Sequence, residues 1–219
     1  MTTVILACEI LKQEVEAARE KVNCSYPIVY IDGGLHMVPQ KLRQEIEKKL
    51  QELPPEVDTV LLAMALCGNA IVGFAAPCRL VVPRMDDCAT IFLHQNDERH
   101  ANLKEKGHFY LNYGYINIKN FVQDDYDYAL EKYGPRRCEK MTRILYQDYV
   151  SVDVVENGAY DAHDKDFLAK VEKVAGIIGC PYRHVPASNL VLEKLFAGRW
   201  DGQFMVVEKG QILQTEQFF

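Results

Sequence analysis

The sequence is poor in the features that mark membrane, secreted and nucleic-acid-binding proteins. None of its apolar runs reaches the roughly 18 residues that a membrane-spanning helix requires. It has no long run of lysine or arginine, and its formal net charge is -6, so it offers nucleic acid no basic stripe. Its first residues lack the basic region and long apolar core of a signal peptide. We therefore expect a cytoplasmic protein that binds neither membranes nor nucleic acid.

Paired metal-binding motifs are also missing. The seven cysteines include no Cys-x-x-Cys pair, which excludes the usual signature of a zinc ribbon or a ferredoxin. Their number is odd, and a chain of 219 residues with 48% hydrophobic residues can bury a core without disulfides. In a reducing compartment such cysteines are buried apolar residues, metal ligands or reactive thiols. Walker, dinucleotide-binding, Gly-x-Ser-x-Gly and His-Glu-x-x-His motifs are absent as well.

Alternating apolar runs and amphipathic segments predict an α/β fold. Short β-rich runs alternate with segments whose apolar residues recur at helical spacing. In the first half we expect strands at 3–7, 27–31, 59–66 and 80–82, helices at 10–21 and 39–53, and a short helix from 89. The order β-α-β-α-β implies a parallel sheet with right-handed crossovers. We therefore predict a Rossmann-like, doubly wound architecture.

A second α/β pattern follows in the C-terminal half. The stretch 108–118 is aromatic and β-rich, and Gly114 marks a kink or a point of close approach. Beyond it we expect helices at 121–133, 136–148, 165–178 and 187–196 and strands at 149–155, 181–185 and 204–207. The pattern fits two lobes, an N-terminal one over 1–118 and a smaller one over 119–219 that begins with a helical connection. One continuous domain remains the alternative.

Cysteine and histidine follow the ends of four predicted strands. Cys8 comes directly after the first strand, His36 a few residues after the second, Cys67 at the end of the third and Cys88 after the fourth. In a parallel sheet all four lie at one edge, the edge where open α/β sheets bind ligands. Three thiols and an imidazole form a soft site that suits zinc or iron better than magnesium or calcium. The alternative is that each cysteine fills a tight space and His36 caps the next helix.

Charged residues beside these positions could take part in chemistry. Glu9 follows Cys8 and could act as an acid, a base or a partner of His36, or could simply favour the positive end of a helix. Asp87 lies at a predicted helix start, and it too could take part in chemistry or simply favour the positive end of the helix. Arg84 could hold an anion or a carboxylate, or form an ordinary surface ion pair.

Two further segments could bind a small-molecule substrate. The turn with Gly68 and Asn69 could direct backbone N–H groups at an anion from the start of a helix. Tyr113 belongs to a polar and aromatic set that alternates along the strand predicted at 108–118, together with Tyr110, Asn112 and Tyr115. One face of that strand could line a pocket, although an ordinary half-buried strand explains the pattern equally well. An exposed aromatic surface there would also fit a homodimer.

Several of these short motifs occur together in one protein family. They are Ala7-Cys8-Glu9-Ile10-Leu11, Leu35-His36 with Pro39, Leu66-Cys67-Gly68-Asn69, Pro83-Arg84 with Asp87-Cys88, and the tyrosine-rich stretch ending at Gly114-Tyr115. With them the chain resembles the domain-of-unknown-function 1638 family of anaerobic bacteria and methanogenic archaea. The family's usual Gly-Trp reads Gly-Tyr here. The resemblance implies a role beside corrinoid-dependent methyltransferases in anaerobic one-carbon metabolism, with a corrinoid protein or a methyltransferase as the partner and the corrinoid carried by that partner.

Residues and resemblance together lead to three hypotheses. In the first, zinc bound by Cys8, Cys67 and Cys88 takes part in methyl transfer between a corrinoid and a thiol, with His36 as a fourth ligand or a base. Arg84 would then position an anionic group. In the second, the same residues hold an iron–sulfur cluster or a corrinoid or other tetrapyrrole, and the protein is a non-enzymatic accessory of a methyltransferase system. In the third, the cysteines only pack, and the protein is a small-molecule binding module.

Overall fold

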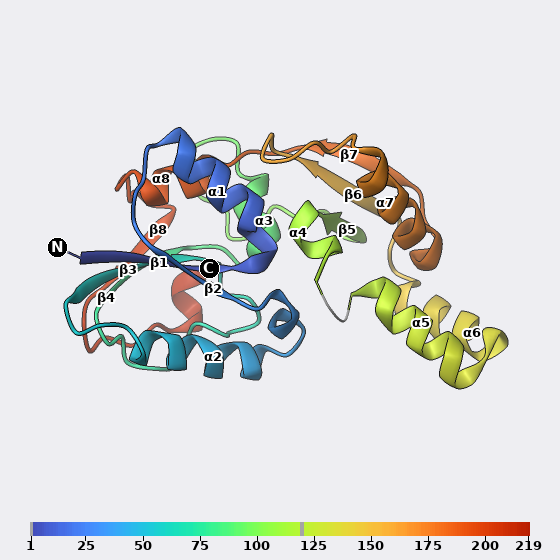
Figure 1. Ribbon diagram of the computed structural model, residues 1–219, viewed down its shortest axis with the longest axis horizontal. Coiled ribbons are helices and arrows are strands. Elements are labelled where there is room, and N and C mark those ends of the chain that lie inside the picture. The colour runs from blue at the N-terminus through green and yellow to red at the C-terminus, as the bar shows by residue number, and fades with distance from the viewer. Residues whose placement is uncertain (1, 119–120) are drawn as a thin grey trace.

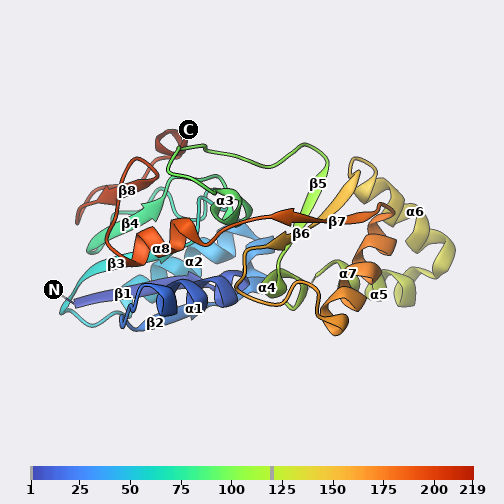
Figure 2. The same ribbon diagram turned by 90° about the horizontal axis from the view of Figure 1, so that it is seen from above.

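The computed structural model describes residues 2–118 and 121–219. These residues form two β-sheets with their own helices, and the two sheets lie side by side along the long axis of the molecule (Figures 1 and 2). Each sheet has its own cluster of buried apolar side chains. We refer to the two halves as the first and the second lobe.

The first lobe is built on a five-stranded sheet in the order β2-β1-β3-β4-β8. Its strands are β1 (Thr2–Cys8), β2 (Ile28–Ile31), β3 (Val57–Ala63), β4 (Arg79–Pro83) and β8 (Phe204–Val207). The first four run parallel, and β8 pairs antiparallel with β4. Strand order reverses between β1 and β3, so the carboxyl ends of these two strands form the switch point at which doubly wound sheets bind ligands.

Helices cover both faces of this sheet (Figure 1). On one face lie α1 (Lys12–Lys21) and α8 (Leu190–Phe196), and on the other lies α2 (Pro39–Gln51). Short helices follow the strand ends: η1 (Glu9–Leu11), η2 (Gly33–Met37), α3 (Cys88–Leu93) and, near the C-terminus, η3 (Thr215–Phe218). Because β1, β3 and β4 are covered on both sides, they are apolar almost throughout. The predicted Rossmann-like α/β fold with a mostly parallel sheet is confirmed.

The second lobe is a three-stranded parallel sheet with helices packed against it. Its strands, in the order in which they pair, are β5 (His108–Leu111), β6 (Ser151–Glu156) and β7 (Tyr182–Pro186). Its helices are α4 (Tyr113–Ile116), α5 (Val122–Tyr133), α6 (Pro135–Tyr146) and α7 (Lys165–Ile178). Val152 and Val154 of β6 belong to the same buried cluster as Phe167 of α7. The side chains that alternate with these valines therefore face away from the helices.

A close backbone contact joins the two lobes. A Cβ atom placed on Gly114 of α4 would lie 2.0 Å from the carbonyl oxygen of Ile10 in η1, so only glycine fits there. Next to it the buried side chain of Asn112 donates hydrogen bonds to the Ile10 carbonyl, at 2.7 Å, and to Oε1 of Glu14, at 2.9 Å. The prediction that Gly114 is a point of close approach is confirmed.

Two local predictions are wrong. The strand predicted over 108–118 ends at Leu111, because Asn112 caps the helix α4 with its side chain and the chain leaves the sheet there. The helix start predicted after Cys67 does not form, and residues 67–71 are a turn. The domain boundary at residue 118 stays a prediction, but the two sheets do not follow it: β5 lies before it and pairs with β6, and β8 lies after it and pairs with β4. Among the described residues no helix has the length and apolar character needed to cross a membrane.

Candidate functional site

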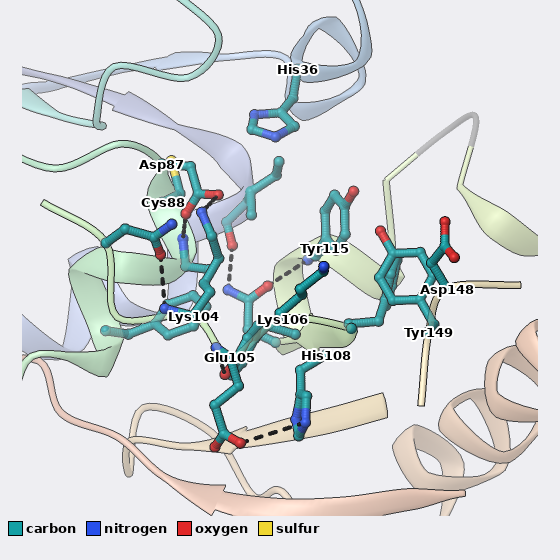
Figure 3. A pocket seen from close by; sticks show the side chains of 18 of the residues that line it. His36, Asp87, Cys88, Lys104, Glu105, Lys106, His108, Tyr115, Asp148 and Tyr149 are labelled. Atoms are coloured by element: carbon teal, nitrogen blue, oxygen red, sulfur yellow. Dashed lines mark hydrogen bonds and ion pairs between the residues drawn. The ribbon is translucent and has the colours of Figure 1, made fainter. Parts of the chain in front are cut away.

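A cleft of about 740 Å³ opens between the two lobes. One wall comes from the strand ends of the first lobe and includes His36, Asp87 and Cys88. The other comes from β5 and the loop before it and includes Glu105 and His108. Figure 3 shows these residues projecting toward a common space from opposite sides, with further aromatic and charged side chains between them. The cleft thus lies at the carboxyl edge of the first sheet, where the sequence placed the site.

The three predicted cysteines form a row at the first-lobe side of the cleft, and of the three Cys88 lines it. The sulfur of Cys88 lies 3.4 Å from that of Cys67 and also contacts the thiol of Cys8. His36 continues the row, because its ring contacts the thiol of Cys67. All three cysteines are free and at most 5% exposed. The structure therefore brings together four residues that lie up to 80 positions apart in the sequence.

The backbone explains why Cys67 and Cys88 meet. The N–H groups of Leu66 and Cys67 donate to the carbonyls of Met85 and Asp86, so pairing between the two chain segments continues beyond the ends of β3 and β4. Cys67 and the next two residues all have left-handed backbone conformations, with φ of 46°, 66° and 69°. For a cysteine this conformation costs free energy, and such strain concentrates at functional sites.

Burial and neighbouring sulfurs raise the pKa values of the Cys67 and Cys88 thiols. The hydrogen bond with Cys88, together with burial, raises the pKa of Cys67 well above its ordinary value. Cys67 hydrogen-bonds Cys88 and favours its thiolate, but contact with Cys8 and burial raise the pKa of Cys88 well above its ordinary value all the same. Contact with Cys67 raises the pKa of His36 more than burial lowers it. The Nδ1 atom of His36 is buried and has no hydrogen-bond partner.

The row is an open arrangement of donors. Within the described part of the chain, the group whose three ligand atoms all lie within 4.8 Å of one another is Glu156, His163 and His184, outside the cleft. The cysteine sulfurs contact one another in sequence, with Cys88 in the middle. Shared coordination of one ion by this row would therefore require side-chain rotation at one end.

Charged groups lie close to the row, and Asp87 and Lys104 act on His36 through their charges. Asp87 caps α3 by accepting hydrogen bonds from the N–H groups of Ala89 and Thr90, and it also pairs with Lys104. Lys104 binds Asp86 as well, at 2.6 Å from Oδ2. The predicted capping role of Asp87 is confirmed, and its carboxylate also lines the cleft. These two ion pairs of Lys104 hold the loop before β5 against the start of α3, where Cys88 lies.

The opposite wall holds a histidine–aspartate pair that sequence reasoning missed. Nδ1 of His108 lies 2.8 Å from Oδ2 of Asp153, a fully buried carboxylate. Asp153 also accepts hydrogen bonds from Ser151, at 2.6 Å, and from Arg183, at 3.0 Å. Burial alone would raise the pKa of Asp153, but these donors lower it. A carboxylate that orients a histidine in a cleft is the arrangement of a general base.

A signal for this pair was present in the sequence. Asp153 stands among three valines of β6, and a carboxylate inside a strand is buried only when it is paired. The partner could not be read from the sequence, because it depends on the parallel register that sets His108 beside Ser151 and Tyr110 beside Asp153.

Five predicted site residues lie away from the cleft. Gly68 and Asn69 are in the left-handed turn, where Asn69 accepts a hydrogen bond from Thr215. Glu9 accepts one from the N–H group of Gly33. The remaining two are directed elsewhere: Nε of Arg84 donates to the Gln217 carbonyl, and Tyr113 stacks on Phe167 in the second lobe. None of the five lines the cleft.

Comparison with known proteins identifies a family but no relative of known function. No curated protein and no solved structure matches the chain. The family described as "Protein of unknown function (DUF1638)" matches residues 30–196, which is well over half of the chain and includes His36, Cys67, Cys88 and His108. The chain therefore belongs to the DUF1638 family.

Proposed function

We propose that the protein binds a soft metal ion, zinc in the first place, at the cysteine row, and presents it to a small substrate in the cleft. Cys8, Cys67, Cys88 and His36 would hold the ion. The observation that carries the proposal is the buried, unpartnered Nδ1 of His36 at the end of a row of three buried thiols. A buried nitrogen without a partner costs free energy, and a metal ion would satisfy it.

The donor set suits this ion. Thiolate and imidazole are the usual ligands of zinc, and three thiols with one imidazole make a known four-ligand combination. The raised pKa values of Cys67 and Cys88 keep these two thiols protonated in the free protein, so metal binding would release their protons. When bound, zinc would supply Lewis acidity that activates a thiol or another acceptor.

The opposite wall would supply proton transfer. Asp153 holds the ring of His108, and that ring lines the same cleft as Cys88. Its Nε2 lies 3.5 Å from the exposed carboxylate of Glu105. A substrate bound between the lobes would therefore meet a soft metal site on one side and a positioned histidine on the other. Lys106 and Asp148 line the cleft as well, so a polar substrate would meet groups of both charges there.

The reaction that we propose is methyl transfer between a corrinoid and a thiol. This part of the proposal comes from the association that the family resemblance implies, with a corrinoid protein or methyltransferase as the partner. The second candidate is an accessory protein in which the same residues hold an iron–sulfur cluster or a corrinoid. The three buried sulfurs favour either metal group over a site built from oxygen ligands.

Metal analysis of protein purified without oxygen tests the proposal. We expect about one zinc per chain at this site and no visible colour, with loss of that zinc in Cys67→Ser and Cys88→Ser. Cys78→Ser is the matched control, because Cys78 is a half-buried cysteine that precedes β4 and so lies at the opposite edge of the sheet. Iron with sulfide and a brown colour would support the accessory protein. Full metal content in both variants, or no metal in the wild type, would refute metal binding at the row.

A further inference from the structure

A second group of metal-binding side chains lies in the second lobe. Glu156 ends β6, His184 lies on the neighbouring strand β7, and His163 belongs to the loop that leads into α7. The carboxylate oxygen Oε1 of Glu156 lies 2.9 Å from Nε2 of His163 and 2.8 Å from Nδ1 of His184. All three ligand atoms lie within 4.8 Å of one another. None of the three residues lines the cleft.

The geometry of the two rings is poor for simple hydrogen bonding. The rings stack, with centroids 4.4 Å apart and planes at 22°. Nδ1 of His184 is buried from solvent and makes no well-directed hydrogen bond, although the carboxylate oxygen lies close to it. Both nitrogens also converge on one oxygen atom. A buried ring nitrogen that lies this close to a carboxylate oxygen without a well-directed hydrogen bond fits a metal ligand set better than a hydrogen-bonded one.

We propose that Glu156, His163 and His184 form a zinc site that is independent of the cysteine row. Two histidines and one glutamate are a donor set that zinc accepts, and they leave coordination positions for water. The side chain of His163 is 69% exposed, so the site opens to solvent and exchanges metal freely. The imidazole and carboxylate ligands set this site apart from the sulfur-rich row in the cleft.

Local structure places His163 within reach of Glu156 and His184. Its N–H group donates to Oδ1 of Asp161, which closes a tight turn, and Asp164 caps α7 through the N–H of Phe167. The side chain of His163 contacts Glu156 and stacks on His184, so loop 157–164 lies against the ends of β6 and β7. Zinc bound here would fasten this loop to β7, which pairs with β6 alone among the strands of its sheet. We therefore expect the metal to stabilise the second lobe.

Zinc titration of the full chain with a competing chromophoric chelator tests the site. We expect His163→Ala and His184→Ala each to weaken one class of zinc binding at least tenfold, roughly the loss seen when support for a metal ligand is removed. That class should persist in Cys67→Ser, which separates it from the proposed row. His100→Ala is the matched control, because His100 is also exposed and lies 3.6 Å from a glutamate, Glu98.

Thermal melting of metal-free and zinc-loaded protein supplies the second readout. Zinc should raise the melting temperature of Cys67→Ser but not that of Cys67→Ser combined with His163→Ala, and the metal-free forms should melt alike because His163 is exposed. Equal zinc affinity of wild type and the double variant His163→Ala/His184→Ala would overturn the proposal. So would loss of all zinc binding in Cys67→Ser alone, since the row would then account for every bound ion.

Discussion

Replacing Gly114 with alanine should weaken the joint between the lobes. The new Cβ would lie 2.0 Å from the carbonyl oxygen of Ile10 and 2.6 Å from its carbonyl carbon, so η1 and α4 must separate by about 1 Å to reach the shortest tolerated contact. The same movement lengthens the 2.7 Å hydrogen bond from Asn112 to that oxygen beyond a useful distance.

The size of the destabilisation follows from the overpacked contact and the lost hydrogen bond. Overpacking a tight contact costs about 1–3 kcal/mol, and a lost hydrogen bond with a buried partner costs about 1–3 kcal/mol more. Alanine is favoured over glycine in a helix by about 1 kcal/mol, which offsets part of the cost. We expect a net destabilisation of about 3 kcal/mol, or roughly 6–12 °C in melting temperature for a chain of this size.

Thermal and urea unfolding of the variant measure this cost. Gly176→Ala is the matched control, because Gly176 lies inside α7 and its added Cβ would meet no atom within 4 Å. That variant should gain about 0.5–1 kcal/mol, because alanine has the higher helix propensity. A Gly114→Ala protein that melts within about 2 °C of wild type would show that the two lobes do not depend on this contact.

Three further predictions concern ionisable groups. Burial raises the pKa of Glu14, so the contribution of this group to stability is present below its unfolded pKa and is lost as pH rises through its folded pKa. In urea unfolding, the free energy of unfolding of Glu14→Gln should therefore rise relative to that of wild type between pH 5 and pH 8. A difference that stays constant with pH would contradict this. The pKa of Asp153 is lowered, so its contribution to stability is present at pH 7 and is lost as pH falls through the folded pKa. Asp153→Asn should therefore cost about 1–3 kcal/mol of stability at pH 7 and progressively less at lower pH. A difference in melting temperature between Asp153→Asn and wild type that does not change with pH would argue against this prediction. Zinc binding at the row should release roughly one proton per thiol ligand, measured by calorimetry in buffers of different ionisation enthalpy, and Cys67→Ser should release fewer.

The sequence alone determined the parallel part of the first sheet, from β1 to β4. Apolar runs such as the one from Thr59 have the length and continuity of strands buried on both faces, and the intervening periodic segments predict the helices. The parallel topology follows from that order, and it sends Cys8, Cys67 and Cys88 to one edge of the sheet. For this reason the cysteine row could be expected before its distances were known.

Only the tertiary structure decided what faces the row. The opposite wall comes from a second sheet, which meets the first lobe where Gly114 contacts Ile10, and no local pattern encodes a contact between segments about a hundred residues apart. The pairing of His108 with Asp153 depends in the same way on strand register. Secondary structure reflects local periodicity, which the sequence displays, whereas a cleft between two lobes reflects the packing of distant surfaces, which it does not.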